Sequence, residues 1–170
     1  KNKKTYSYIR TLEEEMKKAV KYCHIRGVAV YLTLNILLKD EELEKAFLLA
    51  RDAYNMGIDG IIVQDLGFAK ILKDYLPELP LHASTQMSVH SKSALPLLKQ
   101  LGFTQVVVSR EMAKKDLEEF CREAEKYNIT VEVFVHGALC MCVSGQCLLS
   151  AFLGSRSGNR GLCAGPCRLP

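Results

Sequence analysis

The stretch Gly57-Ile-Asp-Gly-Ile-Ile-Val63-Gln-Asp-Leu-Gly67 decides the fold of this chain. Its apolar run at residues 60–63 is rich in β-branched side chains, as expected of a buried strand in a parallel sheet. A helical pattern at residues 41–55 precedes the run and stops at Gly57, and a second pattern at residues 67–75 follows it. A strand between two helices is typical of a parallel βαβ unit.

The alternation of helix and strand continues in both directions from this unit. Further strands are expected at residues 28–34, 81–83, 105–108 and 130–135, and further helices at residues 11–26, 91–101 and 114–127. One strand–helix unit takes about 25 residues, which fits parallel strands joined by right-handed crossovers. Such units in series predict an α/β fold, either a partial TIM-like (β/α)8 barrel or a doubly wound sheet. The first strand is followed by no glycine-rich phosphate loop, which favours the barrel.

Five strands cannot close an eight-stranded barrel, so the chain is expected to be a fragment that lacks the first strand and the last ones. Residues 1–137 are assigned to the partial barrel domain, and residues 138–170 to a cysteine-rich segment of the same truncated domain. No apolar run approaches the roughly 18 residues that cross a bilayer. The lysine-rich start is followed by polar residues, unlike a signal peptide. We therefore expect a cytoplasmic protein without a membrane partner.

Charge is distributed unevenly along the chain. The net charge is +4, which is compatible with nucleic-acid binding without requiring it. After Ile129 the only acidic residue is Glu132, whereas Arg156, Arg160 and Arg168 lie near the cysteines. The C-terminal segment is therefore locally cationic. Arg156 and Arg160 are predicted to offset thiolate charge or to hold a phosphate group of a substrate.

Polar side chains stand where each expected strand ends. In barrels and open parallel sheets, sites form beyond these carboxyl ends. The residues predicted to line the substrate side of such a pocket are Asn35, Gln64, Asp65, His82, Gln86, Arg110 and His136. Three of them are predicted to bind substrate: Asn35, Gln64 and Asp65. The other four are predicted to be catalytic: His82, Gln86, Arg110 and His136.

Three of these assignments have a purely structural alternative. His82 lies within a strand, where a satisfied core histidine is common. Arg110 and Glu111 are adjacent and would form a surface ion pair of small energetic value. Asp65 would be an ordinary loop residue.

Five of the seven cysteines lie between positions 140 and 167, and this clustering needs a chemical explanation. Without a secretory signal, a disulfide framework is disfavoured. Soft thiolates gathered in one segment select zinc, copper(I) or an iron–sulfur cluster, so four cysteines are predicted to be metal ligands: Cys140, Cys147, Cys163 and Cys167. The pair Cys163 and Cys167 has zinc-ligand spacing, whereas the wider gap from Cys140 to Cys147 favours a cluster.

Two other functions are consistent with the same residues. His136 lies close to Cys140, as in a cysteine protease, although a thiolate nucleophile needs only one cysteine. A zinc-stabilised RNA-binding module without catalysis is the second alternative.

Several strings in the chain resemble one known family. They are Glu132-Val-Phe-Val-His136-Gly-Ala-Leu-Cys140, Ser144-Gly-Gln-Cys147-Leu-Leu-Ser150, Val63-Gln-Asp-Leu-Gly67, His82-Ala-Ser-Thr-Gln-Met87, Arg156-Ser-Gly-Asn-Arg-Gly161 and Pro166-Cys167-Arg-Leu-Pro170. Together they look like the signature of the collagenase-like peptidase family U32. The resemblance covers nearly the whole chain, and its long gapped motif is specific.

This resemblance implies a barrel-like α/β enzyme with a historical peptidase label. Its better-understood members are oxygen-independent hydroxylation factors with a 4Fe–4S cluster, acting on a pyrimidine of tRNA or rRNA or on a quinone precursor. Prephenate is implicated as their oxygen source, so a prephenate-like small acid is a candidate partner beside RNA. The string at residues 156–161 resembles the rRNA-modifying branch more than the tRNA branch.

The same resemblance bears on the ligand set. Cys140, Cys147 and Cys163 match cluster-ligand positions, and the fourth ligand is either Cys167 or a cysteine further downstream. Cys142 has no ligand role in the family pattern. The motifs of metallopeptidases and of serine hydrolases are absent from the sequence, which weakens the peptidase reading.

Overall fold

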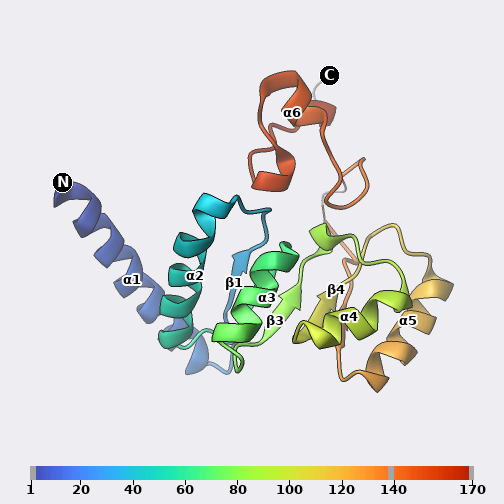
Figure 1. Ribbon diagram of the computed structural model, residues 1–170, viewed down its shortest axis with the longest axis horizontal. Coiled ribbons are helices and arrows are strands. Elements are labelled where there is room, and N and C mark those ends of the chain that lie inside the picture. Colours follow the sequence, from blue (N-terminus) through green and yellow to red (C-terminus); the bar gives the residue numbers. More distant parts are fainter. Residues whose placement is uncertain (1–2, 138–139, 169–170) are drawn as a thin grey trace.

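The computed structural model describes residues 3–137 and 140–168 and has an α/β architecture (Figure 1). A five-stranded parallel sheet has the order β1-β2-β3-β4-β5. The strands are β1 (Tyr31–Leu34), β2 (Gly60–Val63), β3 (Leu81–Ala83), β4 (Phe103–Val107) and β5 (Thr130–Glu132). The α-helices are α1 (Lys3–His24), α2 (Asp40–Asn55), α3 (Leu66–Tyr75), α4 (Leu95–Gln100), α5 (Lys114–Lys126) and α6 (Leu149–Gly154).

Sequential strand order determines where the helices lie. Every strand pairs in parallel with the next strand along the chain, and right-handed crossovers then place all connecting helices on one face of the sheet. The helices α2, α3, α4 and α5 accordingly contact β1, β2, β4 and β5. This arrangement confirms the predicted α/β class and is that of an open portion of a (β/α) barrel.

The two faces of the sheet differ in chemistry. Ile61, Leu81 and Val106 point toward the helices and are completely or almost completely buried in one core with Phe68 and Phe120. The alternate positions on the other face are mainly polar, because Thr33, Ile62, His82 and Gln105 follow one another in register across four strands. The sequential strand order with the connecting helices on one face is that of a barrel wall, whereas a doubly wound sheet carries helices on both faces.

Most predicted elements are confirmed, with shifts at their ends. The predicted helical segment at residues 91–101 is present, but its first turn is a 3-10 turn, η2 (Lys92–Ala94), which α4 follows directly. Pro96 has no N–H and fits only the first turn, so α4 begins at Leu95. The helix α1 begins at Lys3, earlier than predicted, and β5 ends at Glu132 instead of residue 135.

The remaining short elements are 3-10 turns: η1 (Thr85–Met87), η3 (Gly158–Arg160) and η4 (Pro166–Arg168). Within the described residues, no helix combines the length and the apolar character that crossing a bilayer requires.

Candidate functional site

The described part of the cysteine-rich region, residues 140–168, is called the cysteine segment below. In Figure 1 it is the orange to red chain that carries α6, and it lies beyond the ends to which the strand arrows point. This is the end of a parallel sheet at which functional sites form. The segment contains little regular structure, so side-chain contacts from the barrel domain hold it in place.

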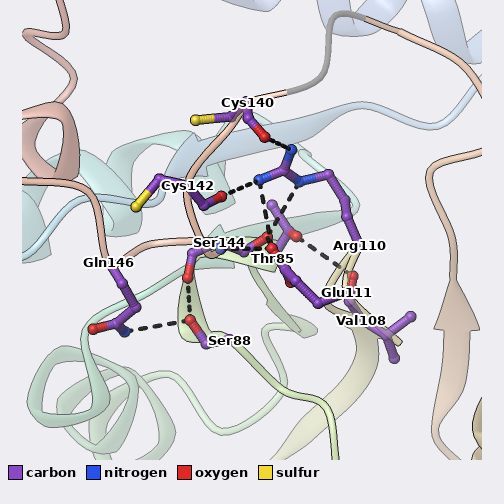
Figure 2. Close-up of polar contacts among 9 residues, drawn as sticks. All are labelled: Thr85, Ser88, Val108, Arg110, Glu111, Cys140, Cys142, Ser144 and Gln146. Atoms are coloured by element: carbon purple, nitrogen blue, oxygen red, sulfur yellow. Dashed lines mark hydrogen bonds and ion pairs between the residues drawn. The ribbon is translucent and has the colours of Figure 1, made fainter. Parts of the chain in front are cut away.

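Arg110, which follows β4, makes the first of these attachments (Figure 2). Its guanidinium donates to the carbonyl oxygens of Cys140 at 3.1 Å and Cys142 at 3.2 Å, and to Ser144 Oγ at 3.2 Å. The planar fork of arginine suits three acceptors at once, and only 18% of the side chain is exposed. Arg110 therefore determines the path of the backbone that carries the first cysteines.

Glu111 completes this attachment from the next position. Its Oε1 accepts from the backbone N–H of Ser144 at 2.9 Å and from Ser144 Oγ at 3.3 Å. Partial burial by itself would raise the pKa of Glu111, but hydrogen bonds from backbone N–H groups and from Ser144, with the charge of Arg110, lower it. The two side chains are thus more than a surface ion pair, since their mutual separation is 3.8 Å and their shorter contacts go to the cysteine segment.

The turn between Val143 and Gln146 is pressed against η1. Its backbone closes with a hydrogen bond from Gln146 N to Val143 O at 3.1 Å, and Gly145 has a positive φ of 72°. A Cβ at Gly145 would overlap the carbonyl group of Gln86. Ser88 Oγ, at the end of η1, donates to Ser144 O, and Gln146 Nε2 donates to Ser88 Oγ at 3.3 Å (Figure 2).

Arg160, in η3, makes a second attachment, to the loop that follows β1 and to the first turn of α2. Its guanidinium donates to Leu37 O at 2.7 Å and to Glu42 Oε1 at 2.5 Å, and Leu37 N donates to Asn159 O at 3.3 Å. Glu42 also accepts from Lys39 N at 2.9 Å, which places its carboxylate at the N-terminus of α2. The hydrogen bond from Arg160, followed by that from Lys39, lowers the pKa of Glu42 to about 2.

This lowered pKa predicts how acid weakens the second attachment. A carboxylate with a folded-state pKa of about 2 and an ordinary value of 4.5 stabilises the folded state fully above pH 4.5, and this contribution disappears as the pH falls toward 2. We expect Glu42→Gln to lower the urea midpoint at pH 7 and the difference from wild type to shrink progressively below pH 4.5. Glu44→Gln, an exposed position on the same helix, is the control. A difference that does not change with pH would contradict the role of this carboxylate.

The four predicted ligand cysteines line one cavity of about 280 Å³ beneath the cysteine segment. Gln86, Arg110 and Asn159 line the same space, so it lies between the segment and the strand ends. Cys142 is not among its lining residues. In the part of the chain that the structure describes, no three histidine, cysteine or acidic side chains converge closely enough to hold a single metal ion.

The backbone N–H groups that follow Cys163 form hydrogen bonds to its thiol and to α6. Gly165 N–H donates to Cys163 Sγ at 3.3 Å, and Ala164 N–H donates to Ser150 Oγ, in α6, at 3.0 Å. An N–H that points at sulfur would stabilise a thiolate there. Arg156 Nε donates to Leu162 O at 3.1 Å and so binds the segment to itself.

The other predicted site residues fall into separate places. Gln64 and Asp65 line a neighbouring cavity of about 480 Å³, and Gln86 borders both cavities. Asp65 caps α3 by accepting from Phe68 N at 2.9 Å, and it accepts from Leu38 N at 3.1 Å. Asp65 therefore has the structural role of a loop residue that caps a helix, because both carboxylate oxygens have backbone partners, and its substrate-binding role stays a prediction. Asn35 and His136 border neither of these two cavities.

His82 lies apart from both cavities, on the polar face of the sheet. Only 5% of it is exposed, its ring centroid lies 4.6 Å from that of Tyr31, and Nδ1 has no partner within the described residues. Burial lowers the pKa of His82, so the ring is neutral at pH 7. His82 is buried, as expected of a core histidine, but its Nδ1 forms no hydrogen bond with the described residues.

Sequence reasoning missed the residues that hold the segment in place. Glu42, Ser88 and Ser144 are common surface residue types, and their partners stand 118, 56 and 33 positions away. Gly145 likewise has no local signal, since its lack of a side chain is required by the close contact with Gln86. Contacts between residues so far apart in the sequence produce no local sequence pattern, so they could not be predicted.

Comparison with known proteins identifies the family. The family model described as peptidase family U32 matches residues 8–170. The chain belongs to peptidase family U32. The resemblance seen in the sequence is thereby confirmed.

U32 relatives carry names of two different activities. The chain is 40% identical over 157 residues to a 23S rRNA 5-hydroxycytidine synthase of Escherichia coli, covering 92% of the chain and 23% of that protein. It is 32% identical to the tRNA hydroxylation protein P of Escherichia coli, covering 91% of the chain and 34% of that protein. It is 31% identical to a collagenase of Porphyromonas gingivalis, covering 91% of the chain and 39% of that protein. The chain thus spans well under half the length of these relatives.

Solved structures agree on the fold of this U32 chain. A U32 peptidase structure superposes with a TM-score of 0.52 at 17% identity, covering 71% of this chain and 50% of that one. A glycerophosphodiester phosphodiesterase from Parabacteroides distasonis gives 0.53 at 18% identity, covering 75% and 51%. These likenesses support the βα-barrel architecture and carry no statement about activity.

Proposed function

We propose that this U32 chain is the cluster-bearing part of an iron–sulfur enzyme that hydroxylates a pyrimidine base of RNA without using molecular oxygen. The observation that carries the proposal is the single cavity lined by Cys140, Cys147, Cys163 and Cys167 at the carboxyl ends of the strands. The names of two relatives, one acting on rRNA and one on tRNA, support RNA as the substrate.

The residues present fit a cluster better than a single zinc ion. Four thiolates around one zinc ion converge to sulfur–metal distances of about 2.3 Å. Here the four cysteines border one space of about 280 Å³, which gives room for a group of several atoms such as a 4Fe–4S cluster. When bound, such a cluster would supply one-electron chemistry.

The chain's own side chains would shape the substrate side of that cavity. Gln86 and Arg110 border it directly, and the neighbouring cavity with Gln64 and Asp65 offers amide and carboxylate groups for a base. The guanidinium of Arg110 is committed to the cysteine segment, so we assign it a positioning role in place of direct catalysis. Arg160 is likewise held by Glu42, and its contact with RNA phosphate stays a prediction, as does a prephenate-like cosubstrate.

Iron and acid-labile sulfide content of the full-length protein, purified without oxygen, tests the cofactor. We expect both in wild type and in Cys121→Ser, whose thiol lies in α5, and a strong loss of both in Cys163→Ser. Zinc without iron in wild type would contradict the cluster and support the RNA-binding module.

Nucleoside analysis of rRNA and tRNA incubated with the iron-loaded protein tests the activity. A hydroxylated pyrimidine that appears with wild type and is absent with Cys163→Ser is the expected result. Cleavage of collagen that survives chelators and is lost in Cys140→Ala, with no modified base, would instead support the peptidase function that one relative's name suggests.

A further inference from the structure

The cavity of about 480 Å³ beside the cysteine-lined one is bordered mainly by uncharged groups. Leu66 and Met87 add apolar surface, and Asp65 is the only charged residue among the described residues of the lining. Four carboxamide side chains supply most of its polar groups: Gln64, Gln86, Gln146 and Asn159. A cavity of a few hundred Å³ with apolar surface and a small number of polar groups is typical of a site for a small organic ligand.

The charge of this lining argues against a phosphate or another anion as the ligand. No lysine, arginine or histidine is among its described residues, and the carboxylate of Asp65 would repel a negative group. A carboxamide presents an acceptor oxygen and N–H donors in one plane, which is also the arrangement along the edge of a nucleobase. The ligand that fits is therefore a neutral planar group with N–H and acceptor atoms side by side.

Gln64, which follows β2 directly, has an acceptor that is not satisfied. Only 7% of this residue is exposed, and its Nε2 donates to Gln86 O at 3.2 Å. That hydrogen bond fixes the orientation of the amide, and Oε1 has no partner within the described residues. A buried acceptor without a donor costs free energy, so an N–H brought by a ligand would stabilise the complex.

The position of the cavity relates it to the proposed cluster. Gln86, Gly145 and Asn159 line both cavities, so a ligand here lies next to the space that the four cysteines border. The lining does not suit the phosphates of an RNA strand, so only the base of a nucleotide fits in it. Enzymes that modify a base turn it out of the stack into a pocket and recognise it through hydrogen bonds to its edge.

We propose that this cavity binds one pyrimidine base turned out of an RNA strand, and that Gln64 Oε1 recognises the base by accepting an N–H from its edge. The donor is the exocyclic amino group of cytosine or the N3–H of uracil. Gln64 is then a specificity-determining residue that contacts the substrate. This inference rests on the function proposed above and assigns its substrate a binding site.

Titration of the full-length protein with nucleosides, followed by calorimetry, tests the recognition. Uridine and cytidine are expected to bind, and 3-methyluridine and N4,N4-dimethylcytidine, which lack the N–H, to bind at least about tenfold more weakly. In Gln64→Leu this difference is expected to disappear, with all four nucleosides bound weakly. Equal affinity of wild type for methylated and unmethylated nucleosides, or no saturable binding of uridine and cytidine, would overturn the proposal.

Two further variants guard against a fold defect in Gln64→Leu, whose urea midpoint is measured alongside. Asn159→Ala keeps the backbone hydrogen bond from Leu37 N and is expected to weaken the binding of uridine and cytidine several-fold. Gln100→Leu removes an exposed carboxamide at the end of α4 and should bind all four nucleosides as wild type does. Unchanged binding in Asn159→Ala would contradict a site in this cavity.

Iron content and RNA kinetics separate this inference from the cluster proposal. Gln64 does not border the cysteine-lined cavity, so Gln64→Leu is expected to keep the iron and sulfide of wild type while its KM for RNA rises at least about tenfold. If wild type distinguishes the methylated nucleosides but never contains iron, the cluster proposal fails and the base site stands. If Gln64→Leu hydroxylates RNA with an unchanged KM, the base site fails and the proposed function stands.

Discussion

Replacing Gly145 with alanine is expected to detach the cysteine segment from the barrel domain. The left-handed φ of 72° costs an L-residue about 1–2 kcal/mol, and the new Cβ would overlap the carbonyl of Gln86. The two costs add, because the turn cannot move away from Gln86 without breaking the hydrogen bonds to Ser88. Limited trypsin digestion measures the result: cleavage after Arg156 is expected to be at least about tenfold faster in the variant.

Gly154→Ala is the matched control for this change. Gly154 lies in α6, where an added Cβ meets no atom within 4 Å, and alanine favours a helix. Its digestion is expected to equal that of wild type. Equal digestion of the two glycine variants would show that the contact of the turn with η1 does not hold the segment.

Replacing Arg110 with alanine is expected to open the same segment from the other side. The change leaves the carbonyl oxygens of Cys140 and Cys142, and Ser144 Oγ, without a charged donor. Hydrogen bonds to charged groups contribute roughly 1.5–3 kcal/mol each in a partly buried setting, so a loss of about 2–3 kcal/mol is a conservative value. Hydrogen exchange at Ser144 N, which donates to Glu111, should quicken by about 30- to 150-fold.

Two further variants make the Arg110 result specific. Arg110→Lys keeps the charge but loses the planar fork, and an intermediate rate of exchange at Ser144 is expected. Arg122→Ala removes an exposed arginine from α5 and should leave the rate unchanged. Exchange at Ser144 that is the same in all three variants would mean that Glu111 and Ser88 hold the segment without Arg110.

The order and type of the main elements could be predicted from sequence because local patterns determine them. The strands at β2 and β3 were predicted to the residue, since β-branched or buried apolar runs lie between glycine or proline stop signals. The ends of α4 and β5 were less certain. Pro96 begins a helix inside a longer helical pattern, and residues 133–135 continue an apolar pattern after the ladder has ended.

The candidate site was predictable in its chemistry but not in its geometry. Clustered thiols predict a metal-ligand set, and the four predicted cysteines border one cavity, while their role as ligands stays a prediction. The positions of Asp65 and His82 could not be resolved in this way. Both follow the pattern of polar residues at strand ends, yet one caps α3 and the other is buried beside Tyr31. Whether a polar side chain caps a helix or is buried on a face of the sheet depends on its tertiary contacts, which the sequence pattern does not show.

The two attachments of the cysteine segment also determine when its cavity can form. Arg110 reaches Ser144 across 34 positions, and Arg160 reaches Glu42 across 118 positions of the chain. Contacts of such long range form late in folding, because the entropy of closing the loop is lost before they can contribute. During synthesis the βα units leave the ribosome before the cysteine segment does. We therefore expect the sheet to form first and to bring the four thiols together afterwards, so that folding of the sheet does not depend on a metal.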